Sequence, residues 1–188
     1  MIRILSVLTA LALAGCFSAG GTREAQRFFV LDVPPPQGAA ASAASLQLQQ
    51  TTATRFYDSQ EIVYSRTPGT RAYYQFSGWT ERPSRRIHKL LADRLDHAGI
   101  AQRADGRASL HVHIDEMFHD AAAPPGTVEI RLTAELLDAG GARLARRAFS
   151  ASAPSATHDA QGAVRAFGEA LGPLLDDIAA WSARATQR

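Results

Sequence analysis

Hydrophobic and polar residues alternate along the second half of the chain, and this pattern predicts half-buried strands. Apolar residues occupy every second position over residues 109–116 and again over residues 127–137, with mostly polar residues between them. Residues 138–141 form an Asp-Ala-Gly-Gly turn signal that leads into a third strand over residues 143–151. These stretches predict an antiparallel meander with one apolar face and one polar face.

The first half of the chain contains shorter strand signals. Residues 27–33 predict a strand that ends at three consecutive prolines, and an alanine-, serine- and glycine-rich loop follows over residues 37–45. Period-two alternation predicts another strand over residues 46–49. Residues 61–65 and 71–76 flank a Pro-Gly turn, which predicts a hairpin.

Two segments have apolar residues at helical spacing. The first begins near Glu81, has a proline in its first turn, and ends at Ala98 just before a glycine. The second begins at about Asp159 and carries an apolar stripe, which is either part of the core or a groove for a partner. Pro173 interrupts this stripe and predicts a kink, or a split near Gly172. The stripe consists of Val164, Phe167, Leu171, Leu174, Ile178 and Trp181.

This order of elements predicts an α+β fold. Strands with one polar face and two amphipathic helices favour a two-layer domain, with a mixed or antiparallel sheet and both helices packed on one face. We predict a single domain over residues 27–185, because no internal repeat or second boundary is evident. Small, polar and glycine-rich residues over 16–26 predict a flexible tether before this domain.

The first sixteen residues resemble a bacterial lipoprotein signal. Arg3 precedes an apolar run over residues 4–14, which is too short for the roughly 20 residues that span a bilayer. A positive start, an apolar run and small residues before position 16 are typical of an export signal. Leu-Ala-Gly-Cys at 13–16 resembles the lipobox, so residues 1–15 are the expected signal peptide and Cys16 the expected lipidation site.

Cys16 is the sole cysteine of the chain, at the one position that lipidation requires. Each buried CH₂ of an acyl chain such as palmitate contributes about 0.8 kcal/mol, so two or three chains form a stable anchor. Phe17 and Ser18 follow the cysteine in place of the aspartate that typically retains lipoproteins in the inner membrane, which predicts the outer membrane. One alternative is an ordinary secretory signal that happens to end at a cysteine, and another is a soluble cytoplasmic protein, which would leave an apolar helix exposed at its terminus.

Composition excludes several classes of protein. The 188 residues carry a formal net charge of +2, far below the clustered basic footprint of a nucleic-acid-binding protein. A single cysteine excludes an internal disulfide framework and a cysteine-rich zinc site. The sequence contains neither a phosphate-binding P-loop nor a G-x-S-x-G nucleophile motif, so we expect no cofactor, no nucleotide and no hydrolase activity.

Three side chains on one predicted strand could bind a metal. His111, His113 and Asp115 project from the same face at two-residue spacing, and His119 follows nearby. Imidazole and carboxylate groups are ligands for divalent metals. The same three residues are equally the polar, solvent-facing side that the alternating pattern requires, and we favour this interpretation.

Aromatic and basic residues suggest two further surfaces. The aromatic residues are either packed in the core and at its edges, or exposed as a patch that docks a partner or lipid. The arginine pairs Arg85-Arg86, Arg146-Arg147 and Arg103/Arg107 are either solvated or contact phospholipid head groups. The aromatic residues in the hairpin region are Tyr57, Tyr73, Tyr74, Phe76 and Trp79.

Four stretches together resemble the ABC-type transport auxiliary lipoproteins, the family that includes the paraquat-inducible protein C type. The resemblance covers nearly the whole chain after the cysteine. Pro173 and the long loop at 37–45 depart from the family pattern. The four stretches are Arg-Phe-Phe-Val-Leu-Asp at 27–32, Tyr-Asp-Ser-Gln-Glu-Ile-Val-Tyr at 57–64, Tyr-Tyr-Gln-Phe at 73–76 with Trp79 and Pro83, and the helix over 84–98 leading into alternating strands.

The resemblance implies a non-catalytic accessory to a lipid transporter, anchored in the outer membrane and facing the periplasm. Its implied partners are an inner-membrane ABC permease and ATPase and a mammalian-cell-entry (MCE) domain protein that bridges the periplasm. The implied cargo is phospholipid or a related hydrophobic molecule, and the implied role is docking of the bridge at the outer membrane. The alternatives are a periplasmic lipid-binding carrier and a metal-dependent periplasmic enzyme that uses His111 and His113.

Overall fold

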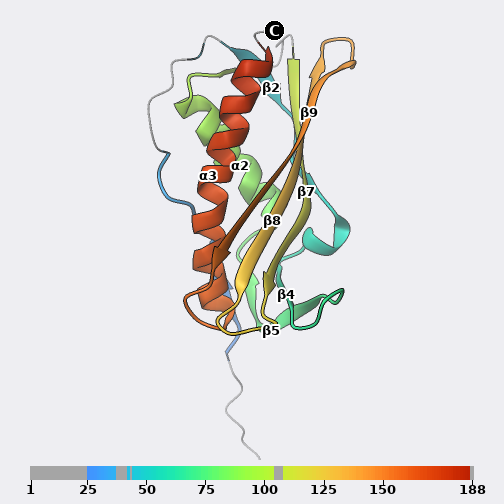
Figure 1. The fold of residues 1–188 in the computed structure, drawn as a ribbon. Helices are drawn as coiled ribbons and strands as arrows, with labels where there is room; N and C mark the ends of the chain where they lie inside the picture. Colours follow the sequence, from blue (N-terminus) through green and yellow to red (C-terminus); the bar gives the residue numbers. More distant parts are fainter. Residues whose placement is uncertain (1–24, 37–41, 43, 104–107, 187–188) are drawn as a thin grey trace, which may run out of the picture.

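Three long antiparallel strands form the larger part of the sheet, as the alternating pattern predicts (Figure 1). The computed structural model describes residues 25–36, 42, 44–103 and 108–186. Strand β7 (Ala108–Asp120) pairs with β8 (Thr127–Asp138), which pairs with β9 (Arg143–Pro154). On β8 the apolar residues of the alternating pattern are buried and the intervening polar residues are not, so the predicted faces are confirmed.

The other edge of β7 pairs with three short strands in succession. β2 (Ser45–Leu48), β3 (Thr52–Ala53) and β4 (Glu61–Ser65) all run parallel to β7, each beside a different part of it. The sheet then continues from β4 to β5 (Ala72–Trp79), its antiparallel hairpin partner, and to β1 (Arg27–Phe29). β6 (Ala101–Gln102) pairs with β2. The nine described strands therefore form a mixed sheet, which confirms the predicted α+β class.

Both described α-helices pack on the same side of the sheet (Figure 1). α2 (Pro83–His97) begins with the predicted proline, and α3 (Ala160–Thr186) contacts α2 and the three long strands. The interface between helices and sheet is filled by fully buried side chains such as Ile87, Leu132 and Phe167. Burial of such side chains is the main stabilising contribution to the fold, at roughly 1.5–3 kcal/mol each.

The predicted split of the second helix near Gly172 is wrong. α3 runs unbroken through Pro173 for 27 residues. A proline in a helix removes one backbone hydrogen bond and clashes with the Cβ of the preceding residue. Here the preceding residue is Gly172, which has no Cβ, and the adjacent Leu171 and Leu174 are buried in the core. Tertiary packing on both sides of the proline therefore holds the helix together.

The predicted strand over residues 27–33 is also too long, because pairing with β5 ends at Phe29. The residues that follow leave the sheet and cross the two helices, and we call residues 31–34 the strap. Leu31 is buried, and its carbonyl accepts a hydrogen bond of 2.7 Å from Arg86 of α2. The strap lies so close to α3 that a Cβ on Gly168 would overlap the carbonyl oxygen of Asp32.

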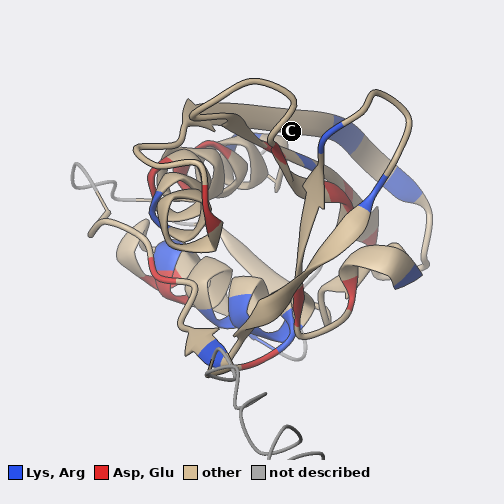
Figure 2. Ribbon diagram, turned by 90° about the horizontal axis from the view of Figure 1, so that it is seen from below, with Lys and Arg blue, Asp and Glu red and all other residues tan. Residues whose placement is uncertain are grey.

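Charged residues of both signs are interspersed over this fold (Figure 2). No helix within the described part of the chain is long and apolar enough to cross a membrane. The predicted signal peptide at 1–15, Cys16, most of the tether at 16–26 and most of the loop at 37–45 lie outside the described residues. The predictions for those segments remain predictions.

Candidate functional site

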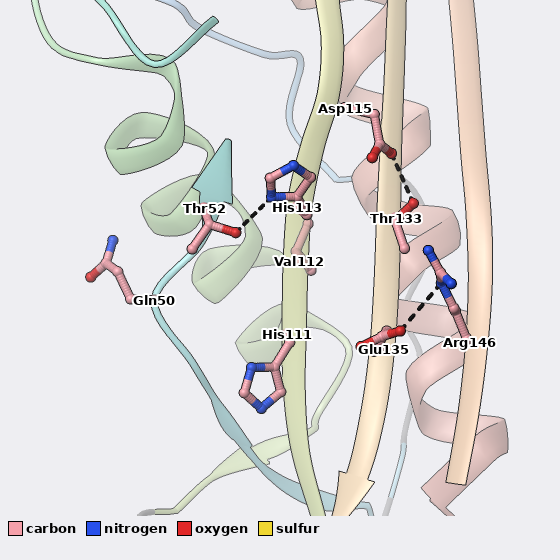
Figure 3. Close-up of a pocket in the computed structure, with 9 residues that line it drawn as sticks. All are labelled: Gln50, Thr52, His111, Val112, His113, Asp115, Thr133, Glu135 and Arg146. Carbon is pink, nitrogen blue, oxygen red and sulfur yellow. Dashed lines mark hydrogen bonds and ion pairs between the residues drawn. The ribbon is translucent and has the colours of Figure 1, made fainter. Parts of the chain in front are cut away.

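The sheet face opposite the helices carries a shallow pocket of about 250 Å³ (Figure 3). The strands β7, β8 and β9 form its floor and residues before and within β3 form one wall. Most of the side chains that line it are polar or charged. The lining residues are Gln50, Thr52, His111, Val112, His113, Asp115, Thr133, Glu135 and Arg146.

His111, His113 and Asp115 lie on this face together, as the alternation along the strand predicts (Figure 3). Their polar atoms are engaged by neighbours. The hydroxyl of Thr52 lies 2.8 Å from Nδ1 of His113, and the hydroxyl of Thr133 donates to Asp115 at 2.8 Å. These contacts orient the side chains as a hydrogen-bonded polar surface.

Charge on this face is also neutralised locally. Glu135 pairs with Arg146 at 3.2 Å and with Arg143 at 3.6 Å. The hydroxyl of Ser109, on the same strand as the two histidines, lies 3.2 Å from Nε2 of His111 and engages that ring nitrogen. Among the described residues, no three histidine, cysteine or acidic side chains come together in a way that could hold a metal ion. The metal interpretation of His111, His113 and Asp115 therefore has no geometric support.

His119 does not join this group, because it points to the opposite face of the sheet. The register of β7 against β8 shifts between Ile114 and Glu116, so Asp115 is an extra residue in a β-bulge. A bulge reverses which later residues face the core. His119 pairs with the buried Val128 and is itself fully buried. The strict alternation that suggested His119 as a neighbour of the other three fails at this bulge.

Buried His119 is held by hydrogen bonds on both ring nitrogens. Nδ1 lies 2.7 Å from the Tyr74 hydroxyl, and Nε2 lies 3.3 Å from the carbonyl oxygen of Pro125. A carbonyl can only accept, so Nε2 carries the proton and Nδ1 accepts from the tyrosine. Burial lowers the pKa of His119 and raises the pKa of Tyr74 to about 12. This neutral pair stabilises the fold and is not exposed to a substrate.

The hairpin aromatics are divided between core and surface. Trp79 and Tyr57 are buried and Tyr74 is half-buried, whereas Tyr73 and Phe76 are exposed. Trp79 packs edge-to-face on Phe167, with ring centroids 5.7 Å apart, and Tyr73 instead stacks on exposed Phe56. Neither predicted interpretation holds for the whole set.

Five large apolar side chains are exposed on β1, on β5, and on the segments just after β1 and just before β4. Their exposed fractions are 56% for Phe28, 54% for Val30, 37% for Phe56, 38% for Tyr73 and 37% for Phe76. β1 pairs with β5, and the Phe56 ring stacks on Tyr73 of β5 at a centroid distance of 4.7 Å. We call the four aromatic residues among them, Phe28, Phe56, Tyr73 and Phe76, the entry-end aromatic group. The sequence identifies Tyr73 and Phe76 as members of an aromatic cluster, but it does not predict which aromatic residues are exposed.

The arginine pairs have separate roles. Arg85 is exposed beside Glu81, but Arg86 holds the strap, so the interpretation of this pair as solvated is wrong for Arg86. Arg147 lies over the ring of Phe149, 4.9 Å from its centroid. Arg103 is exposed, and Arg107 lies outside the described residues.

A second pocket, of about 390 Å³, lies between the start of β9 and the last turns of α3. It brings together Arg147, from one of the arginine pairs, and Trp181, from the apolar stripe. No local sequence signal identifies this pocket, because its two walls are far apart in the chain. It is lined by Leu144, Ala145, Arg147, Trp181, Arg184, Ala185 and Thr186.

Comparison with known proteins supports the resemblance seen in the sequence. A model of the family described as "ABC-type transport auxiliary lipoprotein component" matches residues 29–179. The chain is similar in fold to protein XCC0632 from Xanthomonas campestris, with a TM-score of 0.77, 23% identity, and coverage of 86% of this chain and 97% of that one. It is also similar in fold to hypothetical protein CT253 from Chlamydia trachomatis, with a TM-score of 0.52, 9% identity, and coverage of 77% and 98%. No curated protein matches the chain.

Proposed function

Because the chain belongs to the family of ABC-type transport auxiliary lipoprotein components, we propose that it docks a transporter partner at the outer membrane. In this proposal, Cys16 carries the acyl chains that anchor the protein, and its domain faces the periplasm. The partner is the MCE-domain protein that bridges the periplasm, and the cargo is phospholipid or a related lipid. The chain itself is not catalytic, and the ATPase supplies the energy.

The entry-end aromatic group is the observation that carries the docking proposal. It includes four of the six large apolar side chains that are most exposed among the described residues. Exposed apolar side chains grouped on one part of a soluble domain mark sites of protein or membrane contact. The first described residues, which follow the predicted tether, lie at the same end of the molecule as the label of β5 (Figure 1).

The predicted tether limits how far this end lies from the membrane. Eleven residues, 16–26, span at most roughly 36–40 Å when fully extended. The anchor therefore keeps the entry-end aromatic group within reach of the membrane surface, where a bridging partner would arrive. Its apolar side chains would provide the contact area and the acyl chains would provide the localisation.

Two alternative functions have less support from the described residues. A lipid carrier needs a large cavity between the helices and the sheet. The middle of that interface is filled by buried side chains such as Leu132 and Phe167, and the pocket of about 390 Å³ between β9 and α3 lies at the end of the helix. A metal-dependent enzyme needs converging ligands, but Thr52 and Thr54 already engage the two ring nitrogens of His113. Docking requires neither feature.

The test is crosslinking and recovery of the full lipidated protein from membranes. We expect an MCE-domain protein to be recovered with the wild type, and much less with the double variant Phe56→Ser and Tyr73→Ser. Gln75→Ser is the matched control, because Gln75 is an exposed polar residue on the same strand.

Three results would contradict the proposal or part of it. Failure to recover an MCE-domain protein with the wild type would refute docking. Equal recovery by the double variant and the control would exclude the entry-end aromatic group as the surface. Phospholipid that copurifies with the delipidated domain would favour the carrier instead.

A further inference from the structure

Strand β9 presents a backbone edge that no other described strand pairs with. It pairs with β8 along one side only, over 12 residues. Natural proteins usually protect such an edge with charged side chains, with bulges or by covering it. In β9 these protective features occur only in the first part of the strand. Arg143, Arg146 and Arg147 lie there, and Leu144 is a bulge residue with no partner on β8.

The rest of the edge is open to a strand. Residues 148–153 carry no charge, and all but Phe149 have small side chains. Ala148, Ser150 and Ser152 are exposed. An extended chain can approach such an edge closely and form main-chain hydrogen bonds with it, a recognition mode known as strand addition.

The pocket at the start of β9 adds side-chain selectivity to this edge. Leu144, Ala145 and Trp181 form apolar walls, and the guanidinium groups of Arg147 and Arg184 also line the pocket. Its volume of about 390 Å³ is large enough for a bulky side chain. Because alternate residues of an added strand point to the same side, one of its side chains can enter the pocket while its backbone follows β9.

The charge of the pocket indicates the chemistry of its occupant. The described residues that line it contribute two guanidinium groups and no carboxylate. In the described part of the chain, neither Arg147 nor Arg184 forms an ion pair, whereas Arg143 and Arg146 both pair with Glu135. Two uncompensated arginines beside an apolar wall favour a carboxylate next to an apolar side chain.

We propose that β9 and this pocket bind an extended segment of a partner protein, added as a strand. An apolar side chain of the segment fills the space beside Trp181, and an acidic side chain or a terminal carboxylate pairs with Arg147 and Arg184. The pocket lies at the opposite end of α3 from residue 160, roughly 30 Å away at 1.5 Å per helical residue. The pocket is therefore distinct from the entry-end aromatic group, and the proposal depends on the proposed docking function only for the partner's identity.

The experiment is selection of a random ten-residue peptide library on the purified full-length protein. We expect enriched peptides to combine apolar residues with an acidic residue or a free carboxyl terminus. Loss of charge-assisted hydrogen bonds should weaken binding of an enriched peptide about tenfold or more in Arg147→Ala and in Arg184→Ala. Arg165→Ala is the control, because Arg165 is an exposed arginine near the other end of α3. It should leave affinity unchanged.

Amide hydrogen exchange separates strand addition from simple occupation of the pocket. We expect a bound peptide to slow the exchange of amides over residues 145–153. Binding that leaves these amides unprotected would overturn the proposal, as would selection of basic peptides or no enrichment above protein-free beads. Protection of β9 in a dimer of the chain alone would assign the edge to a second copy instead. None of these results bears on whether the MCE-domain protein is recovered from membranes.

Discussion

Replacing Gly168 with alanine should destabilise the protein, although the same change stabilises most helices. In a helix interior, alanine is favoured over glycine by about 1 kcal/mol. Gly168 is buried in α3 where the strap crosses it, and an added Cβ would overlap the carbonyl oxygen of Asp32. This obstacle is backbone, so no side-chain rotation can relieve the overlap.

The strap can respond in two ways, and both are costly. If it stays in place, overpacking costs about 1–3 kcal/mol. If it moves away, Leu31 loses its burial at about 1.5–3 kcal/mol, and the hydrogen bond from Arg86 to the Leu31 carbonyl is weakened. A rigid obstacle favours the upper part of these ranges. After subtracting the helical gain, we expect a net loss of about 2 kcal/mol, or roughly 4–8 °C in Tm for a domain of this size.

Urea unfolding, followed by the fluorescence of Trp79 and Trp181, measures this effect. The matched control is the exposed neighbour Glu169, where comparison of Glu169→Gly with Glu169→Ala gives the intrinsic difference between the two residues on this helix. If Gly168→Ala stabilises the protein by as much as alanine does at position 169, the close approach of the strap is wrong. A change in the urea midpoint without a change in slope would show that only stability changed.

Three further changes test the core, the buried histidine and the anchor. Phe167→Ala removes a buried ring that packs on Trp79 and should cost about 3–5 kcal/mol in urea unfolding, whereas Phe28→Ala at an exposed site should stay within about 0.5 kcal/mol. Because the pKa of His119 is lowered in the folded state, the unfolded chain binds a proton at this histidine at a higher pH than the folded protein does. The free energy of unfolding is therefore highest above about pH 6.5 and falls as the pH drops below it. His119→Gln should make that decline shallower. If the urea midpoints of the wild type and of His119→Gln fall by the same amount between about pH 7.5 and pH 5.5, His119 is not the group responsible for the decline. Cys16→Ser should move the protein from the membrane fraction to the soluble fraction on immunoblots, and retention in membranes would exclude lipidation at this residue.

Much of the fold follows from local pattern. The alternation along β8 is enough to assign its buried and exposed faces, because successive side chains on a strand point to opposite sides. The apolar spacing of α2, together with its first-turn proline, is enough to place that helix. The family resemblance also follows from sequence, since the matching residues 29–179 include three of the four stretches that carry it and most of the first one, at 27–32.

Features that depend on contacts between distant segments could not be derived in this way. The bulge at Asp115 turns His119 away from His111 and His113, and alternation alone predicts the opposite. Arg86 looks like a solvated residue in sequence and holds the strap in the structure, because its partner Leu31 lies 55 residues earlier. Pro173 is a third example. Local rules predict that it disrupts the helix, but packing against the core keeps α3 continuous.

The sequence by itself therefore determined the fold class, the family and the chemistry expected at Cys16, since each depends on residues close together in the chain. Only the tertiary structure decided which surfaces are available for partners. Exposure depends on what packs above a side chain, so Tyr73 is exposed while Trp79 on the same strand is buried. The pocket between β9 and α3 exists for the same reason, because folding brings Arg147 and Arg184, which are 37 positions apart in the chain, to the lining of one pocket.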